Sequence, residues 1–289
     1  MGVFKVAAVQ MRSGTDPQRN VVEMERLVRE AAGQGATYVQ TPEMTGAMVR
    51  AANTRKAIFA VEANDKVVAA ARRLAGELGI FLHIGSTAIL RADGKVANRA
   101  YLFSPQGGLV AGYDKIHMFD VDLDNGESWR ESAVYEPGAQ AVVADLNGTK
   151  LGFSVCYDLR FPQLFRAEAL AGAEILTVPA AFTRQTGEAH WHVLLRARAI
   201  ENGAFVVAAA QGGLHEDGRE TYGHSLIVDP WGRVLAEVDH DEPGVIVAEI
   251  DPAQSQAARR KIPNLKNARE FALATESGAG VGTLRGAAS

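Results

Sequence analysis

The sequence predicts an α/β fold built on one mixed sheet or on two sheets. Short apolar runs rich in β-branched residues alternate with amphipathic segments along the chain, as strands and helices do when they pack in layers. Tight-turn sequences join several pairs of these runs, and such hairpins argue against a purely parallel sheet. Because no linker rich in Pro, Gly or Ser occurs before residue 276, we expect one domain over residues 1–275 and a flexible tail over 276–289.

The first half of the chain begins with a predicted buried strand at residues 3–10. Asp16 is then placed to cap a helix that has Pro17 at its first position and that ends at the glycines of 33–35. A short strand at 38–40 leads into Thr41-Pro42-Glu43. The further elements expected in this half are a helix at 62–78 and strands at 80–86, 97–103 and 109–113.

The second half contains two predicted hairpins. The first pairs strands at 140–145 and 150–156 around Asn147-Gly148, and the second pairs 223–228 and 233–238 around residues 229–232. The other elements expected in this half are helices at 162–171 and 189–202 and strands at 175–178, 204–210 and 245–250. From about residue 254 the chain is expected to be irregular.

The composition excludes several classes of function. Lys and Arg number 30 against 34 Asp and Glu, so the net charge is −4, and nothing in this balance suggests a surface for nucleic acid or a polybasic patch for a membrane. Lys5, Gln10 and Arg12 interrupt the first apolar run, unlike a signal peptide, and no apolar run reaches the roughly 18 residues of a spanning helix. We therefore expect a cytoplasmic protein without nucleic-acid or membrane partners.

Cys156 is the only cysteine, so it cannot form an internal disulfide, and a reducing compartment suits it. A lone cysteine is often a small buried apolar residue. Cys156, however, ends an apolar run and precedes a turn and a helix, which is where α/β folds carry reactive groups. The helix start and Arg160 favour a thiolate there, and a nucleophile also needs a histidine or a carboxylate as its base.

Metal and cofactor sites are not indicated by the sequence. His190 and His192 stand two residues apart in a predicted helix and so lie on different faces, which does not suit a zinc pair. The sequence has neither a P-loop nor a glycine-rich dinucleotide motif after a strand. We expect an activity that needs no metal and no cofactor.

Three stretches carry a family resemblance: QTPEMT (40–45), YDKIHMFDVD (113–122) and LGFSVCYDLRFPQL (151–164). They resemble, in order, the segments that bear the catalytic glutamate, lysine and cysteine of the nitrilase superfamily of carbon–nitrogen hydrolases. The similarity runs from residue 3 to about 265, and residues 186–211 and 221–234 resemble the Nit branch of amidases. The resemblance implies a four-layer αββα sandwich with two mixed sheets, and a homodimer or higher homo-oligomer formed through a helical face.

The resemblance assigns Glu43, Lys115 and Cys156 as a catalytic triad. In these roles Glu43 takes the thiol proton, and burial is expected to raise its pKa. Lys115 binds the oxyanion beside the backbone N–H of Tyr157. The residues alone leave other readings open, with Glu43 as a solvated loop carboxylate and Lys115 as a surface lysine.

The second active-site glutamate of the family corresponds to Glu131 or to Glu127. The sequence GESWRES contains two similar Glu-Ser steps, so either carboxylate could match. We choose Glu131 because the number of residues between it and Pro137-Gly138 fits the Nit branch better. It is expected to orient the base and the substrate.

Arg160, four residues after the thiol, has two readings. It can form a bidentate pair with a substrate carboxylate, or it can pair with Asp158 at the helix start. Phe182 and Thr183, which follow the strand ending near Pro179, are further candidates for the substrate pocket.

The expected function is cysteine-dependent hydrolysis of a small amide through a thioester, with release of ammonia and a carboxylic acid. The resemblance indicates an amide of a 2-oxo acid, such as deaminated glutathione or 2-oxoglutaramate. The alternatives are an N-carbamoyl amino acid amidohydrolase, a nitrilase and, from another class, a non-catalytic binding protein on the same scaffold. The presence of all three triad residue types argues against the binding protein.

Overall fold

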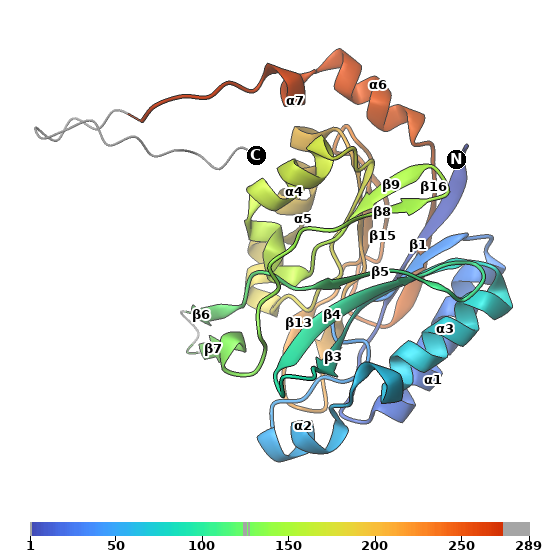
Figure 1. Cartoon of the computed structure of the whole chain (residues 1–289), viewed down its shortest axis with the longest axis vertical. Helices are drawn as coiled ribbons and strands as arrows, with labels where there is room; N and C mark the ends of the chain where they lie inside the picture. Colours follow the sequence, from blue (N-terminus) through green and yellow to red (C-terminus); the bar gives the residue numbers. More distant parts are fainter. Residues whose placement is uncertain (1, 124–125, 127, 274–289) are drawn as a thin grey trace, which may run out of the picture.

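The computed structural model describes residues 2–123, 126 and 128–273, so the tail predicted at 276–289 lies outside the described residues. Two six-stranded sheets face one another, and helices cover the outer side of each (Figure 1). The αββα sandwich with two mixed sheets is therefore confirmed. Among the described helices, none combines the length and the apolar character needed to cross a membrane.

The first sheet has the order β16-β1-β2-β3-β4-β5. Strands β1, β2 and β3 run parallel, whereas β16, β4 and β5 pair antiparallel with their neighbours. The last strand of the chain thus joins the first. The bounds are β1 (Phe4–Gln10), β2 (Tyr38–Gln40), β3 (Phe81–Leu90), β4 (Val96–Phe103), β5 (Leu109–Asp114) and β16 (Gly244–Ile250).

The second sheet repeats this pattern of strand directions, in the order β15-β14-β11-β10-β9-β8. Strands β9, β10 and β11 are parallel, and the outer strands are antiparallel to their neighbours. Asn147 and Gly148 both have positive φ angles in the predicted hairpin between β8 and β9, as a primed turn requires. The bounds are β8 (Val143–Leu146), β9 (Thr149–Gly152), β10 (Ile175–Thr177), β11 (Phe205–Ala208), β14 (Leu226–Val228) and β15 (Val234–Glu237).

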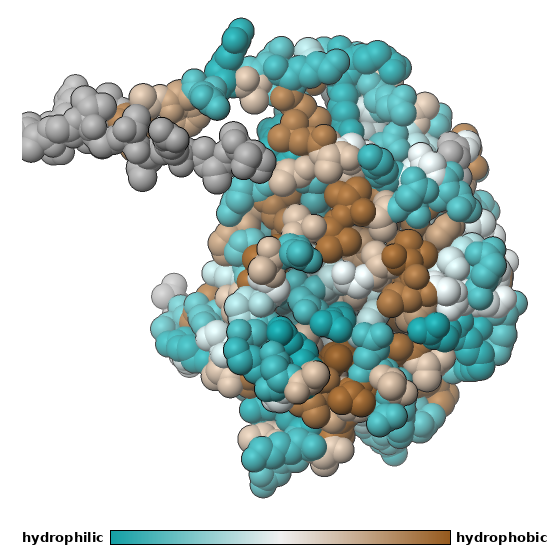
Figure 2. Space-filling model, in the orientation of Figure 1, coloured by the Kyte–Doolittle hydropathy of each residue, from teal (hydrophilic) through white to brown (hydrophobic). Residues whose placement is uncertain are grey.

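Helices α1 (Pro17–Gly33) and α3 (Lys66–Leu78) lie side by side on the first sheet, and α4 (Pro162–Leu170) and α5 (Arg184–Asn202) lie on the second (Figure 1). The predicted cap of α1 is present, since Asp16 accepts a hydrogen bond from Gln18 N at 2.8 Å. On the face shown in Figure 2, apolar residues form a broken stripe between the two helix pairs.

The apolar interior has two parts. One fills the space between the sheets and extends under α4 and α5, with members such as Tyr38, Phe153 and Phe205. The other lies between the first sheet and the helices α1 and α3, with members such as Met24 and Leu74. Burial of these faces fixes which edge of each sheet meets the other, and so fixes where the loops converge.

Several predicted boundaries are wrong. The helix expected at 62–78 divides into a 3₁₀ turn, η1 (Glu62–Asn64), and α3, because Asp65 caps α3 by accepting from Val68 N at 2.9 Å. The helix expected at 189–202 begins five residues earlier, at Arg184. The strand expected at 150–156 ends at Gly152. Local pattern alone does not locate these ends, since caps and tertiary contacts decide them.

Some elements were not predicted from the sequence. The segment expected to be irregular from about residue 254 forms α6 (Ala253–Lys261) and α7 (Asn264–Asn267). Arg259 anchors α6 by donating from Nε to Asn202 O at 3.0 Å, a contact invisible in a local pattern. The other missed elements are α2 (Ala52–Ile58) and the small sheets of β6 (Asp120–Asp122) with β7 (Ser128–Arg130) and of β12 (Gly212–Leu214) with β13 (Glu220–Tyr222).

Candidate active site

Cys156 is the first residue of a short 3₁₀ helix, η3 (Cys156–Arg160), four residues beyond the end of β9. Its backbone lies in the left-handed region, with φ of 51°, which is costly for a residue with a side chain. Its N–H donates to Pro179 O at 2.9 Å, and this bond to the segment after β10 holds the strained turn. Strain of this kind is concentrated at functional sites, where surrounding contacts maintain it.

Glu43 follows β2 and is 4% exposed, so it is not a solvated loop carboxylate. Its Oε1 accepts from Lys115 Nζ and from Asn98 Nδ2, each at 2.9 Å, and its Oε2 accepts from the backbone N–H of Ala181 at 3.0 Å. The Cys156 thiol lies close enough to the same carboxylate for each group to shift the pKa of the other. The two sheets therefore contribute one group each to a carboxylate–thiol pair.

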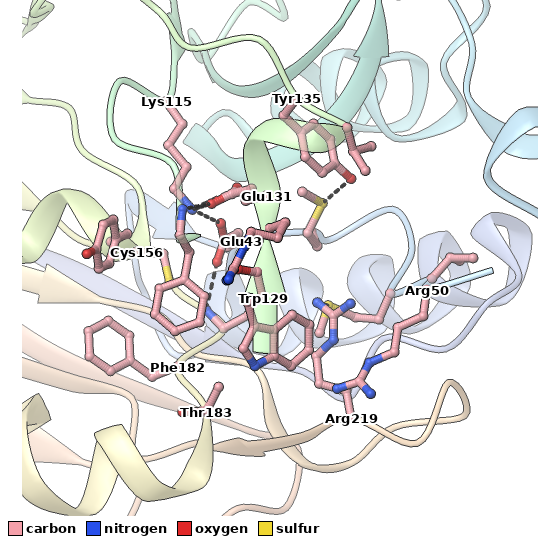
Figure 3. A pocket seen from close by; sticks show the side chains of 18 of the residues that line it. Glu43, Arg50, Lys115, Trp129, Glu131, Tyr135, Cys156, Phe182, Thr183 and Arg219 are labelled. Atoms are coloured by element: carbon pink, nitrogen blue, oxygen red, sulfur yellow. Dashed lines mark hydrogen bonds and ion pairs between the residues drawn. The ribbon is translucent and has the colours of Figure 1, made fainter. Parts of the chain in front are cut away.

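Lys115 follows β5 and is 2% exposed, so it is not a surface lysine. Its Nζ also donates to both carboxylate oxygens of Glu131, at 2.9 and 2.8 Å (Figure 3). Glu131 begins the 3₁₀ turn η2 (Glu131–Ala133) and accepts from Phe119 N at 2.6 Å. The structure thus brings Glu131 to the cluster, whereas Glu127 lies outside the described residues.

Two residues to which the sequence assigned no place in this cluster hold it together. Asn98 donates from Nδ2 to Glu43 Oε1 and to Glu131 Oε1, at 2.9 and 3.1 Å. Asp158 is fully buried, and its carboxylate accepts from Tyr113 Oη at 2.7 Å and from Val155 N at 2.8 Å. Asp158 therefore joins the end of β5 to the strained turn at Cys156. In the sequence, the only signal for such a role is that Asn98 is a polar residue within a predicted apolar strand.

The charge states follow from burial and from the neighbouring charges. Burial raises the pKa of the Cys156 thiol, and Glu43 adds to that rise while Lys115 opposes it. Burial by itself would raise the pKa of Glu43, but the Lys115 ammonium and the hydrogen bonds from Lys115, Cys156 and Asn98 outweigh it, so that pKa is lowered. The expected rise in the Glu43 pKa and the expected thiolate are therefore wrong for the free protein. The resting site holds a thiol beside an ionised carboxylate.

Gly85, in β3, permits the close approach of the two halves behind Glu43. A Cβ at this position would lie 2.2 Å from Thr41 O and 2.4 Å from the Cβ of Pro179. Both distances are shorter than any stable contact, so a larger residue would push the Glu43 loop away from the segment that also binds Cys156 N. A glycine is required here by packing rather than by its φ angle.

The remaining predicted residues all line one cavity of about 370 Å³ beside Cys156. Tyr157, Phe182 and Thr183 form its wall near the thiol. The guanidinium of Arg160 lies 5.5 Å from the Phe182 ring and 3.3 Å from His190 Nδ1. It makes no ion pair with Asp158, whose carboxylate faces Tyr113 and His117 instead, so that reading of Arg160 is wrong.

The opposite end of the cavity was not predicted. It is lined by Arg50, Arg55, Trp129 and Arg219, and Figure 3 shows Arg50 and Arg219 converging on Trp129 away from Cys156. Arg50 and Arg219 come from loops, Arg55 from the unpredicted helix α2 and Trp129 from the unpredicted strand β7, so no motif connected them. Among the described residues, no group of three or more His, Cys, Asp or Glu is arranged to hold a metal ion.

Comparison with known proteins gives a consistent result. A family model described as carbon–nitrogen hydrolase matches residues 5–260. The chain is 40% identical over 268 residues to a protein of Yersinia enterocolitica named deaminated glutathione amidase, covering 91% of this chain and 92% of that one.

Solved structures show the same fold. The NitFhit protein of C. elegans superposes with a TM-score of 0.86 at 32% identity, covering 93% of this chain and 66% of that longer one. An amidase of Nesterenkonia sp. superposes with a TM-score of 0.75 at 29% identity, covering 90% and 95%. Other structures of that amidase carry acrylamide or an acetamide moiety on the active-site cysteine.

Proposed function

Because the chain belongs to the carbon–nitrogen hydrolase family, and is an amide-hydrolysing enzyme, we propose that Cys156, Glu43 and Lys115 perform its reaction. One observation carries the proposal: a single buried carboxylate, that of Glu43, accepts from the Lys115 ammonium at 2.9 Å and lies close enough to the only thiol of the chain for each to shift the pKa of the other. A base, a nucleophile and a cation within one dry cluster are the parts that acyl transfer needs.

Acylation begins with the thiol protonated and Glu43 ionised. Glu43 takes the thiol proton as Sγ attacks the amide carbon, so the S–C bond forms without a free thiolate in the resting site. The oxyanion that develops is stabilised by the Lys115 ammonium and by the N–H of Tyr157, one of the first N–H groups of η3, which have no partner within the helix. Glu43 then gives its proton to the leaving nitrogen, the C–N bond breaks, and a thioester remains.

Deacylation reverses the proton path. Glu43 takes a proton from water, the hydroxide adds to the thioester carbon, and the same two donors, Lys115 and the N–H of Tyr157, stabilise the second oxyanion. The C–S bond then breaks, and the thiol recovers the proton from Glu43. Glu131 and Asn98 hold the side chains of Glu43 and Lys115 in position through their shared hydrogen bonds.

For the substrate we propose an amide of a 2-oxo acid. The relatives named deaminated glutathione amidase support this class. Arg160 lies beside Tyr157 and Phe182, and we assign to it the carboxylate of the 2-oxo acid because a guanidinium can form a bidentate pair with a carboxylate. The leaving group is ammonia when the substrate is 2-oxoglutaramate and cysteinylglycine when it is deaminated glutathione.

N-carbamoyl amino acids and nitriles are the alternative substrates, and a binding protein without turnover is the alternative from another class. A panel of deaminated glutathione, 2-oxoglutaramate, an N-carbamoyl amino acid and a simple nitrile separates them. We expect turnover of a 2-oxo acid amide and a thioester on Cys156 by mass spectrometry. Absence of both product and adduct with all four compounds would overturn the proposal.

We also propose a cytoplasmic homodimer or higher homo-oligomer. A single cysteine suits a reducing compartment. Leu170 of α4 and Val193 and Ile200 of α5 are apolar and exposed. The outer helical layer therefore has apolar surface that a second copy of the chain can bury. Light scattering coupled to size-exclusion chromatography tests the state, and a monomer at micromolar concentration would contradict it.

A further inference from the structure

The cavity beside Cys156 carries an excess of positive charge in an acidic protein. Two carboxylates, those of Glu43 and Glu131, line it, against six cationic residues, although the chain as a whole has a net charge of −4. The six are Arg50, Arg55, Lys115, Arg130, Arg160 and Arg219. A cleft lined by one sign of charge concentrates ligands of the opposite sign.

Only some of these cations are compensated by the protein. Lys115 lies between two glutamates, and Arg130 pairs with Asp122 at 2.9 Å. Arg219 has one carboxylate nearby, that of Asp217, at 3.3 Å. Arg50 and Arg55 make no ion pair with any carboxylate in the part of the chain that the structure describes. Arg160, near the thiol, likewise makes no ion pair with a carboxylate in the described part of the chain, so uncompensated cations lie at both ends of the cavity, with Arg50 and Arg55 at the end away from the thiol.

Arg50 and Arg219 meet at one aromatic ring. Their guanidinium carbons lie 4.3 and 4.8 Å from the ring centroid of Trp129 (Figure 3). The Nε of Arg219 is buried and has no hydrogen-bond partner among the described residues. Two like charges held on one indole repel each other, and an anion placed against both relieves that repulsion while receiving forked hydrogen bonds.

An aromatic wall separates these arginines from the reacting centre. The ring of Tyr157, next to Cys156, lies 5.2 Å from that of Phe119, which lies 6.3 Å from that of Trp129. About three residues of extended chain, at roughly 3.3–3.6 Å each, approach the combined length of these two ring-to-ring steps. Arg160 lies beside Tyr157 and Phe182, near the thiol, so the two cationic sites are separate.

We propose that Arg50 and Arg219, with Trp129 as the wall, form a subsite for a carboxylate carried by the leaving amine. The preferred substrate is then an N-substituted amide that is anionic at both ends: Arg160 binds the carboxylate of the acyl part, and the new subsite binds that of a dipeptide-sized leaving group. This inference rests on the proposed function, since it extends the same cavity. It distinguishes such a substrate from a primary amide, whose leaving group is ammonia.

The test compares deaminated glutathione with the same compound capped as a C-terminal N-methylamide, by release of the 2-oxo acid. A hydrogen bond to a charged group is worth enough that we expect kcat/KM to be about 10- to 100-fold higher for the free acid, mainly through KM. Arg50→Gln and Arg219→Gln should each bring this ratio towards one. Arg50→Lys keeps the charge but not the fork, so it should restore only part of the preference.

Arg130→Gln is the matched control, because Arg130 lines the same cavity but is paired with Asp122. Its ratio should stay at the parent value. An equal fall in the Arg130 and Arg50 variants would mean that the overall field, and not a subsite, selects the acid, and would overturn the proposal. A parent ratio near one, or a ratio unchanged by Arg50→Gln, overturns it as well. Arg50 is exposed, so its replacement does not threaten folding.

A binding measurement separates this inference from the proposed function. Calorimetry of the Cys156→Ala variant with cysteinylglycine and with its N-methylamide needs no turnover. If both substrates are hydrolysed equally well and the dipeptide binds no tighter than its capped form, the subsite is wrong and the amidase stands. If no amide is hydrolysed but the dipeptide binds through Arg50, the subsite stands and the proposed reaction is wrong.

Discussion

The two ends of the cavity differ in how their charges are balanced. At the catalytic end, Lys115 and Glu43 are almost completely buried, and each charge has its partner in the protein within 3 Å. At the outer end, Arg50 is exposed and its guanidinium lies over the Trp129 ring. Arg219 has one carboxylate nearby, that of Asp217, at 3.3 Å.

This difference has a physical reason. A buried charge is tolerated only when a partner and hydrogen bonds replace water, so the catalytic end must be balanced before substrate arrives. Its protonation states are thereby fixed in advance. A cation near the surface remains partly hydrated, so it needs no partner in the protein before an anionic ligand binds. The inner end therefore determines the chemistry, while the outer end is suited to selecting the substrate.

The largest effect should come from the nucleophile at the inner end. Cys156→Ala removes the only thiol, and loss of a catalytic nucleophile can cost about 10⁶ in kcat. We expect no measurable turnover in the amide assay but a thermal unfolding midpoint close to that of the parent. Appreciable residual activity in a preparation free of parent enzyme would show that Cys156 is not the nucleophile.

Lys115→Met should come next. It removes a charged donor from the oxyanion, which costs about 10²–10³ in kcat or more, and leaves Glu43 and Glu131 without their shared cation. Stability should fall as well, because breaking a buried pair costs about 3–5 kcal/mol. The control is Lys95→Met, whose side chain is exposed and pairs with Glu136 at 2.7 Å. Equal kcat for the two folded variants would exclude the role of Lys115.

Glu43→Gln should change how Cys156 reacts with pH. The lowered pKa of Glu43 keeps the base ionised through the neutral range, so alkylation of the parent by iodoacetamide should vary little there and decline as acid protonates the base. Without the base, alkylation near neutral pH should slow about tenfold or more and recover as pH rises through the thiol's own pKa.

Removing the Glu43 charge also favours the thiolate, but burial is the larger cause of the raised thiol pKa and is unchanged in the variant. Burial should therefore decide the outcome. Glu136→Gln, at a more exposed carboxylate, should retain the parent profile. Superimposable profiles for Glu43→Gln and the parent would contradict the assignment of Glu43 as the base.

Salt should weaken the attraction of anions to the exposed arginines at the outer end more than the buried ion pairs at the inner end. Exposed charges are screened as the Debye length falls from about 10 Å at 0.1 M to 3 Å at 1 M salt. The preference for alkylation by anionic iodoacetate over neutral iodoacetamide should therefore fall a few-fold between these concentrations. The decrease should be smaller in Arg50→Gln. A preference that does not respond to salt would mean that the outer arginines do not attract anions.

The smallest effect is expected from chelation, since Lys115 already supplies the positive charge at the inner end. Dialysis against EDTA, followed by its removal, should leave kcat unchanged. The removal matters because a polyanion can compete at the arginines. Loss of activity that zinc or manganese restores would contradict a mechanism based on Cys156, Glu43 and Lys115 alone.

The sequence by itself determined the features that depend on local interactions. The strand at β1, the cap and first turn of α1 and the turn between β8 and β9 were predictable, because neighbouring residues decide them. The quoted motifs around Glu43, Lys115 and Cys156 likewise carried the family resemblance without any knowledge of distances.

Only the tertiary structure decided what these residues do to one another. Burial alone predicted a raised pKa for Glu43, but the fold places the Lys115 ammonium 2.9 Å from its carboxylate and lowers that pKa. The contact of Arg50 and Arg219 with Trp129 joins two loops and the strand β7, which no local pattern connects. Charge interactions depend on distance through space and on burial, and neither quantity is written in the order of the residues.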